Sequence, residues 1–347
     1  MQYTSWKAQD LEPDARIPRP LPPKLLWAIA ILLSLGVTFW AGSHTLSQFP
    51  VDDNGGIHLA VSPHCGDLSG TVADVNAGLE LRTYNTIVSF GDSYTDGGRQ
   101  DGSPLDPPIL HPPDPGAGGR STNGKVWIEH VADGVGARLM DYAASIAIWG
   151  LYRPLVVAQQ SEESRFLNTF LSQANEIDSE STLFSIFFGI NDYEASKRDG
   201  DHLSAAAEVI LAKIQLLAAE PTSARSFLLA DAYGRGVHTP AGEAYRQTLF
   251  SGLYQLSLGQ NISAPVKVAF ADIGKIWDGV LGPNPGYRAF GYTSTESCTL
   301  CNEHGCTMEG MCDDPAHYFY WIPGHPSKET MRIMADYVQK VLHECGI

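Results

Sequence analysis

Three polar side chains, far apart in the chain, are of the types that acyl transfer needs. Ser93 follows Phe-Gly-Asp, Asn191 follows Gly-Ile, and His325 lies between a glycine and a proline. Ser93 is a candidate nucleophile, and His325 is a candidate general base that takes its proton and then delivers it to the leaving alcohol. The Ser93 backbone N–H and the Asn191 side-chain amide are candidate donors to the tetrahedral oxyanion.

Each of these short motifs also has an ordinary structural explanation. Gly-Asp-Ser is a frequent turn and helix-cap sequence. Asn-Asp is common in loops, and a histidine before a proline and a helix often packs or caps. The hypothesis of a catalytic site therefore depends on which elements position the three residues.

Short apolar runs rich in β-branched and aromatic residues alternate with helical stretches from residue 84 onward. Runs of this kind are typical of buried parallel strands, and their alternation with helices predicts a doubly wound α/β sheet. The predicted strands are residues 84–90, 182–188, 226–230 and 266–271, with a further short strand near 138–142. The predicted helices are residues 126–137, 162–175, 203–219, 243–258 and 327–343.

In such sheets the ligand crevice lies beyond the carboxyl ends of the strands. Ser93 follows the first predicted strand, Asn191 follows the strand at 182–188, and His325 precedes the last helix. We therefore expect the three side chains to meet at one edge of the sheet. Residues 100–120, dense in proline and glycine, predict a long surface loop near the end of the first strand.

Composition excludes some classes of function. The 347 residues are 44% hydrophobic and 18% charged, which is typical of a globular protein. A net charge of −16 argues against a general nucleic-acid binder, because phosphate binding needs clustered Lys and Arg.

The N-terminal region predicts export. Residues 1–24 read as a short cytoplasmic tail, 25–42 as a transmembrane signal anchor, 43–83 as a stem, and 84–347 as the catalytic domain. The run at 25–42 is apolar and uncharged, with basic residues before it and none after it until Arg82, which places the N-terminus in the cytoplasm. We expect a single-pass membrane protein with its catalytic domain lumenal or extracellular. The alternative is a cleaved secretory signal and a secreted domain.

All six cysteines follow the apolar run, in an oxidising compartment, and predict up to three disulfides. They are Cys65, Cys298, Cys301, Cys306, Cys312 and Cys345. A zinc site formed by Cys298, Cys301, His304 and Cys306 is the alternative for part of this set. Asn261 lies in an Asn-Ile-Ser sequon, which this topology permits to be glycosylated.

The Phe-Gly-Asp-Ser93, Gly-Ile-Asn191-Asp and His325-Pro motifs together resemble the GDSL, or SGNH, hydrolase family over about residues 84–343. The segment from Asp313 to Pro326 is similar to fungal secreted members that resemble carbohydrate acetylesterases. The resemblance implies a flavodoxin-like three-layer α/β/α sandwich with five parallel strands, with no metal and no organic cofactor. It also implies Ser93 as nucleophile, His325 as base and Asn191 as oxyanion donor.

The sequence departs from this family pattern at two positions. Ile322 stands three residues before His325, where the family usually has an acidic residue that orients the imidazole. A backbone carbonyl is one substitute, and Asp313 or Asp314 folding back is another. Ile146 stands where a glycine usually lends its N–H to the oxyanion, so its side chain crowds the third donor.

We therefore expect a serine ester hydrolase that acts on small acyl esters, and the resemblance suggests acetyl groups on cell-wall polysaccharide. Two alternatives stay open: a catalytically degenerate relative that binds glycans or partners, and a lipid-ester hydrolase next to the anchoring membrane. Among the weaker candidates, Tyr94 is expected to line the acyl pocket, and Asp96 to stabilise the turn after Ser93. Trp127 is expected on the buried face of its helix.

Overall fold

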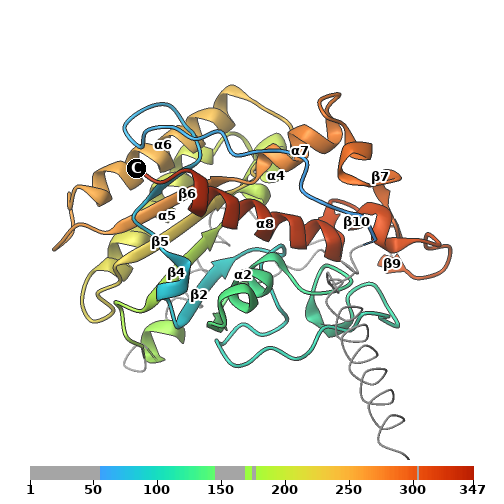
Figure 1. Ribbon diagram of the computed structural model, residues 1–347, viewed down its shortest axis with the longest axis horizontal. Helices are drawn as coiled ribbons and strands as arrows, with labels where there is room; N and C mark the ends of the chain where they lie inside the picture. Colours follow the sequence, from blue (N-terminus) through green and yellow to red (C-terminus); the bar gives the residue numbers. More distant parts are fainter. Residues whose placement is uncertain (1–54, 145–168, 174–176, 303–304) are drawn as a thin grey trace, which may run out of the picture. The chain divides into compact units, whose positions relative to one another are not determined.

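A computed structural model of the protein describes residues 55–144, 169–173, 177–302 and 305–347. This part of the chain contains a six-stranded central sheet with the strand order β1-β6-β5-β4-β2-β3 (Figure 1). Strands β2 to β6 are parallel to their neighbours, and β1 runs antiparallel to β6. The strands are β1 (Val75–Ala77), β2 (Thr86–Gly91), β3 (Arg138–Asp141), β4 (Thr182–Phe187), β5 (Ser226–Asp231) and β6 (Lys267–Asp272). The predicted mixed α/β fold with a mostly parallel sheet is confirmed.

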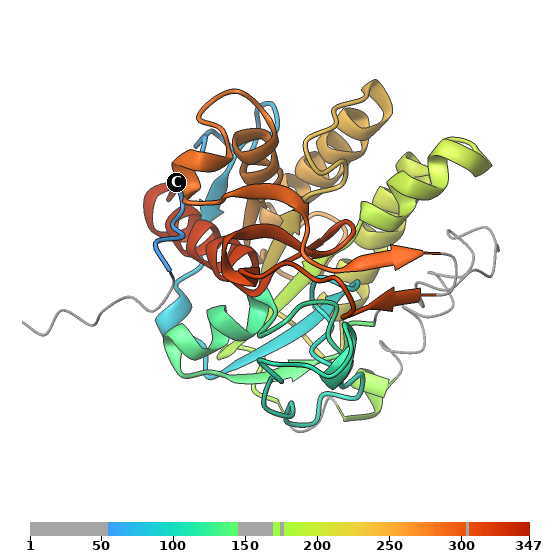
Figure 2. The same cartoon turned by 90° about the vertical axis from the view of Figure 1, so that its right-hand side faces the viewer.

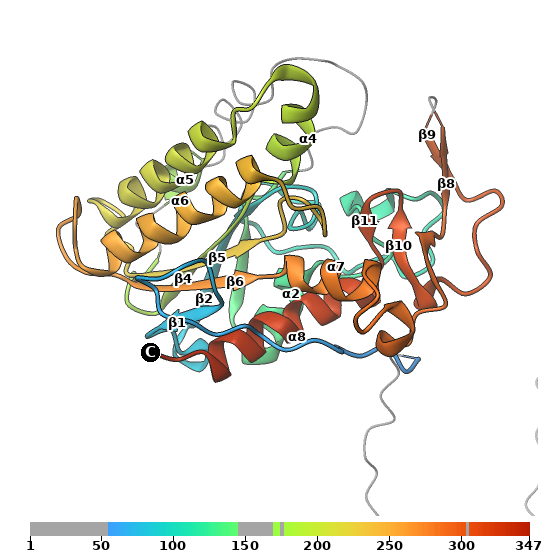
Figure 3. The ribbon, with the colours of Figure 1, turned by 90° about the horizontal axis from the view of Figure 1, so that it is seen from above.

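Helices cover both faces of this sheet, which explains why the strands are nearly continuous apolar runs. Ile87 and Leu183 face one core, whereas Val88 and Phe184 face the other. Figure 3 shows the two helical layers on opposite sides of the strands. One layer is α2 (Trp127–Val135), α7 (Gly274–Leu281) and α8 (Lys328–Glu344), and the other is α5 (Leu203–Ala218) and α6 (Pro240–Ser257). The three layers agree with the predicted sandwich.

Capping side chains set where two predicted helices begin. Helix α6 starts at Pro240 because the Thr239 hydroxyl accepts the Gly242 N–H at 3.1 Å, and proline suits the first helical position. Helix α8 starts after Ser327, whose hydroxyl accepts the Thr330 N–H. The sequence did not predict α7 or the ten-residue α4 (Ile190–Asp199). Most of the predicted helix 162–175 lies outside the described residues.

The segment before β2 corrects the predicted five-strand count, because it adds a sixth strand to the sheet. The blue segment that begins at residue 55 first runs along α8 in Figure 1 and Figure 3, where Lys340 Nζ donates to Ser62 Oγ at 3.0 Å. It then reaches α6, where the Val72 N–H donates to Gln247 Oε1 at 3.2 Å. Strand β1 then adds a sixth strand to the sheet. The Asn76 side-chain amide donates to the carbonyls of Leu79 and Leu342 at 2.8 and 2.7 Å. The described part of the predicted stem therefore belongs to the folded domain.

A smaller region of strands carries the candidate base. Strands β7 (Ser294–Ser297), β10 (Tyr318–Ile322) and β11 (His325–Pro326) form a three-stranded sheet, and β8 (Leu300–Asn302) pairs with β9 (Gly305–Thr307). Short 3-10 helices precede β7 at Tyr287–Phe290 and β10 at Pro315–His317, and two more lie at Leu81–Thr83 before β2 and at Ala117–Gly119 before α2. The teal segment of residues 100–120 lies beside β10 in Figures 1 and 2, where the Trp321 indole donates to the Pro115 carbonyl at 3.0 Å.

The six cysteines form three disulfides, Cys65–Cys345, Cys298–Cys312 and Cys301–Cys306. The predicted disulfides are confirmed. The alternative zinc site is wrong, because its three cysteine sulfurs are bonded to other sulfurs. His304 lies outside the described residues.

The predicted membrane segment at residues 25–42 also lies outside the described residues. Within the part of the chain that the structure describes, no helix has both the length and the apolar character that a bilayer crossing requires. The anchor therefore stays a prediction from sequence.

Breaking Cys65–Cys345 is expected to destabilise the domain more than breaking Cys301–Cys306, because the first closes a chain segment of 280 residues and the second one of 5. Chain entropy puts the losses of unfolding free energy at about 5.6 and about 2 kcal/mol. Urea denaturation of the C65S/C345S and C301S/C306S variants measures both. Equal losses, or a larger loss for the short loop, would contradict the expectation.

Candidate active site

Ser93 lies on a tight turn immediately after β2. The Asp92 carbonyl accepts the N–H groups of Thr95 and Asp96 at 2.9 and 3.0 Å, which bends the chain back at the end of the strand. A side chain at Gly91 would place its Cβ 2.5 Å from Thr95 Oγ1 and 3.1 Å from the Phe187 carbonyl. Glycine is therefore required at this position, because only glycine lets the turn close against β4.

The turn brings the Ser93 hydroxyl to His325. Ser93 Oγ lies 2.9 Å from His325 Nε2, although the two residues are separated by 232 positions in the sequence. His325 comes from β11, directly before the Ser327 cap of α8, so the first parallel strand and the last helix meet at this point. The distance is within hydrogen-bonding range for a nucleophile and its general base.

The other imidazole nitrogen faces a backbone carbonyl. His325 Nδ1 lies 3.2 Å from the Pro323 carbonyl oxygen, which accepts only if Nδ1 carries the proton. That assignment leaves Nε2 unprotonated and able to accept from Ser93. The backbone-carbonyl alternative of the sequence analysis is therefore the one that the geometry supports.

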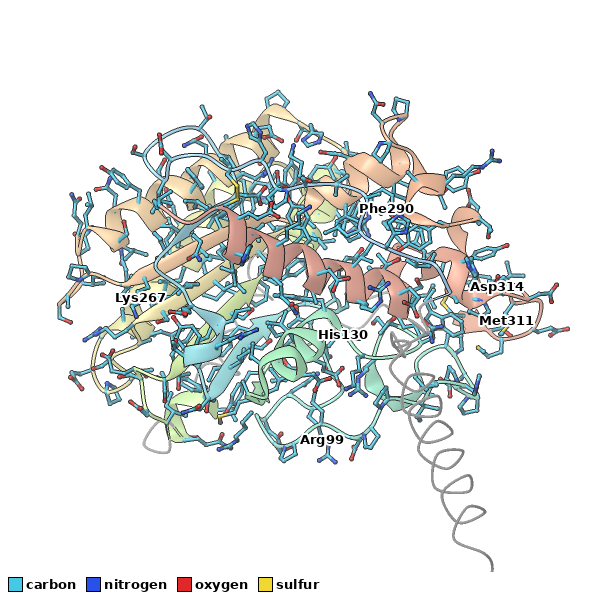
Figure 4. The ribbon with its side chains drawn as sticks, in the orientation of Figure 1. Arg99, His130, Lys267, Phe290, Met311 and Asp314 are labelled. Atoms are coloured by element: carbon cyan, nitrogen blue, oxygen red, sulfur yellow. A yellow bond between two sulfur atoms is a disulfide. The ribbon has the colours of Figure 1, made fainter. Side chains whose placement is uncertain are left out.

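Neither candidate acid takes this position. The Asp314 carboxylate lies 2.7 Å from His317 Nδ1, in the segment that leads into β10. Figure 4 labels Asp314 near Met311 in that segment, and Asp313 immediately precedes it. The Pro323 carbonyl faces Nδ1, so the geometry favours the backbone acceptor, and an orienting role of Asp313 or Asp314 stays a prediction from sequence.

Asn191 lies on the first turn of α4, directly after β4. Strands β2 and β4 are adjacent and parallel, with Gly91 opposite Phe187, so Ser93 and Asn191 leave the same edge of the sheet. Gly189, with φ of +119°, makes the turn into α4, and a Cβ there would lie 2.5 Å from the Tyr245 hydroxyl. Asn191 is half-buried. Its placement beside the nucleophile turn agrees with a role as oxyanion donor, which stays a prediction.

Comparison with protein-family models gives a match that spans most of the described domain. The model of the family described as GDSL-like Lipase/Acylhydrolase matches residues 87–338, which is more than half of the chain. The chain belongs to this family. A comparison with curated proteins found no significant match.

A buried carboxylate that the sequence analysis missed joins two loops of this GDSL-like domain. Asp141, the last residue of β3, accepts the Ala143 N–H at 3.0 Å through Oδ1 and the Gly97 N–H at 2.7 Å through Oδ2. It therefore ties the start of the predicted oxyanion loop to the loop after Ser93. Burial raises the pKa of Asp141 well above its usual value. The position of Asp141 at the carboxyl end of a predicted strand is the sequence feature that could have identified it as a residue of the site. Ile146 lies outside the described residues.

The three weaker candidates have structural roles. The Asp96 carboxylate accepts the Gly98 N–H at 2.8 Å, as expected for a turn residue. Trp127 is fully buried and donates to Thr95 Oγ1 at 3.1 Å. Tyr94 is 1% exposed and its hydroxyl donates to the Gly324 carbonyl, so it packs beneath the His325 segment rather than lining a pocket.

Burial controls the protonation of the two groups that flank Ser93. It lowers the pKa of His325 to about 4, with a smaller lowering from the Arg235 cation and an opposing contribution from the Pro323 carbonyl. Burial also raises the pKa of Asp92 to about 7, and the Asp92 Oδ2 atom has no hydrogen-bond partner within the described part of the chain. At neutral pH the imidazole is therefore uncharged, as a general base must be.

We expect His325 to titrate near pH 4, well below the ordinary value for histidine, because its charged form is poorly solvated. His238 is the internal comparison, because Glu243 and Asp278 each lie 2.8 Å from its ring and raise its pKa. NMR titration of the imidazole nitrogens measures both residues in one sample. A His325 midpoint at or above 6.5 would contradict the burial assigned to this base.

Proposed function

We propose that this domain hydrolyses small acyl esters, with Ser93 as nucleophile and His325 as general base. The contact of 2.9 Å between Ser93 Oγ and His325 Nε2 is the observation that carries the proposal. The neutral imidazole and the family membership support it as well. A single proton acceptor facing a buried serine hydroxyl is the arrangement that acyl transfer requires.

The reaction follows from these two groups. Ser93 Oγ attacks the ester carbonyl while its proton passes to His325 Nε2. When the tetrahedral intermediate collapses, the bond to the alcohol oxygen breaks and Nε2 delivers that proton to the leaving alcohol. A water molecule then attacks the acyl-enzyme with His325 again as base, which releases the acid and restores Ser93.

The oxyanion of each tetrahedral intermediate needs donors that are already in place. We assign this role to the Ser93 backbone N–H and the Asn191 side-chain amide. The Ile146 backbone N–H is the third donor proposed from sequence. The β2–β4 register supports the positions of the Ser93 and Asn191 donors. The hydrogen bonds of Asp141 to the Gly97 and Ala143 N–H groups support the position of the segment that leads to Ile146.

Acetylated cell-wall polysaccharide is the substrate class that we propose, on the resemblance to carbohydrate acetylesterases alone. Lipid esters are the competing class, since the sequence predicts a membrane anchor. Hydrolysis rates for short-chain against long-chain p-nitrophenyl esters distinguish the two. We also propose that the domain works outside the cytoplasm, which the three disulfides support.

Replacing Ser93 with alanine is expected to lower p-nitrophenyl acetate hydrolysis by the full-length protein more than 10³-fold, roughly, because no other group supplies the attacking oxygen. Ser89 provides a matched control on the same strand. It is fully buried, and its hydroxyl has no hydrogen-bond partner among the described residues, so S89A should keep the wild-type rate. Equal rates for wild type and S93A would remove the mechanism and favour a binding role for the fold.

Replacing Asn191 with alanine is expected to lower kcat by about 10²–10³-fold with a smaller change in KM, because an oxyanion donor acts mainly in the transition state. Asn261 is the control. It lies in the loop before β6, at the amino-terminal end of the parallel strands, opposite to the end that carries Ser93. Lys267, labelled in Figure 4, marks that end. The N261Q variant should keep wild-type kinetics. A KM change with unaltered kcat in N191A would contradict the assigned role.

A further inference from the structure

One backbone carbonyl beside the catalytic histidine receives two side-chain donors. The Gly324 carbonyl accepts from the Tyr94 hydroxyl, and from Arg235 Nη1 at 3.1 Å. Gly324 lies between Pro323, whose carbonyl faces His325 Nδ1, and His325 itself. The two donors therefore hold the peptide unit that joins the orienting carbonyl to the base.

The two donors come from different strand ends. Tyr94 follows β2, and Arg235 lies in the loop between β5 and α6. The Tyr94 ring stacks between those of Phe187 and Trp277, at centroid distances of 5.8 and 5.9 Å. Its phenol keeps its proton because burial raises the pKa of Tyr94 far above the physiological range, so it acts as a donor to the carbonyl.

Arg235 is held in an uncommon backbone conformation. Its φ is +47°, in the left-handed region that side chains other than Asn, Asp and Gly rarely adopt. A Cβ on the preceding Gly234 would lie 1.9 Å from the Val237 carbonyl, and the following Gly236 has φ of +85°. Unfavourable conformations of this kind persist where the surrounding structure requires them, which often marks a functional position.

The guanidinium is fixed on its other side by an anion. Arg235 Nη2 donates to Glu194 Oε1 on α4 at 2.6 Å. Gly324 has φ of +73°, and a Cβ there would lie 2.8 Å from Arg235 Nη1. The guanidinium therefore packs closely against the glycine backbone, and the positive φ favours glycine at position 324.

We propose that Tyr94 and Arg235 are positioning residues that fix the Pro323–His325 segment, so that the Pro323 carbonyl orients the imidazole where Ile322 provides no carboxylate. This inference rests on the proposed esterase function. The two residues act through His325 and not on the substrate. Among the described residues, Glu194 pairs with Arg235. The Arg235 cation also opposes part of the pKa increase that burial causes at Asp92, Tyr320 and Tyr94.

The arrangement has an electrostatic consequence that a purely structural role lacks. A carboxylate would stabilise the imidazolium that forms during proton transfer, whereas the Arg235 cation opposes it and lowers the pKa of His325. Glu194 offsets part of that charge. Removing the cation should therefore loosen the histidine and at the same time make it more basic.

The test compares the full-length Y94F, R235Q, R235K and Y94F/R235Q variants with wild type and S93A. Each of Y94F and R235Q should lower kcat for p-nitrophenyl acetate by about 10- to 100-fold, with KM nearly unchanged, because a misplaced base slows proton transfer. The double variant should lose less than the product of the single losses, because both donors hold one carbonyl. R235K, which keeps a cationic donor, should recover part of the rate.

The pH dependence separates positioning from loss of folding. R235Q should raise the midpoint of the acid limb of kcat/KM and the NMR midpoint of His325, whereas Y94F should leave both near the wild-type value. Two control variants change residues at the amino-terminal ends of the strands, away from His325. Y84F removes a buried phenol hydroxyl that donates a hydrogen bond to Ser226. R225Q removes a guanidinium that donates to two backbone carbonyls at 3.1 Å. Both should keep wild-type kinetics.

Wild-type kcat in Y94F and R235Q, or losses that simply multiply in the double variant, would overturn the positioning role. In those cases S93A would still be inactive and the esterase function would stand. If wild type and S93A hydrolysed p-nitrophenyl acetate at the same rate, both proposals would be overturned. This result differs from failure of the positioning role alone, in which wild type is active and S93A is inactive.

Discussion

The contact between the Ser93 hydroxyl and the His325 imidazole is the constraint on which the rest of the domain depends. The two residues come from opposite ends of the domain sequence and must be held within hydrogen-bonding distance. On one side, Gly91 lets the turn after β2 close against β4. On the other, the Asn123 side chain accepts the Lys328 N–H at 2.9 Å and fixes the start of α8. Small losses of register at either end would separate the Ser93 hydroxyl from the His325 imidazole.

The base has an unusual electrostatic setting. The His325 imidazole is neutral, poorly solvated and faced by a carbonyl, with a cation nearby, and none of the residues that the structure describes brings a carboxylate to its Nδ1 atom. A histidine with a low pKa is always ready to accept a proton but accepts it with less driving force. In the mechanism that we propose, geometry must therefore supply more of the rate than in a triad with a carboxylate. The Pro323–His325 segment, held by Tyr94 and Arg235, is the part of the structure to which we assign that requirement.

Strand-end placement was predictable from sequence because apolar runs identify parallel strands, and ligand sites lie at their carboxyl ends. That reasoning brought Ser93 and Asn191 to one edge, whereas His325 was predicted as their partner from its position before the last helix and from the resemblance to the family. It missed β1, because its three residues, Val-Asn-Ala, show no strand pattern and are held by Asn76 contacts from distant segments. It also left the acceptor at His325 open, because a residue type does not reveal where a backbone carbonyl points. Ile146 and the membrane segment stay predictions.

The most direct test of the central claim is intact-mass analysis of the full-length protein after treatment with a fluorophosphonate. This reagent bonds covalently to a serine that is activated by a base. The Ser93–His325 contact predicts one adduct per chain on Ser93, and none in a His325→Ala variant under the same conditions. An unlabelled wild-type protein, or equal labelling without His325, would contradict it.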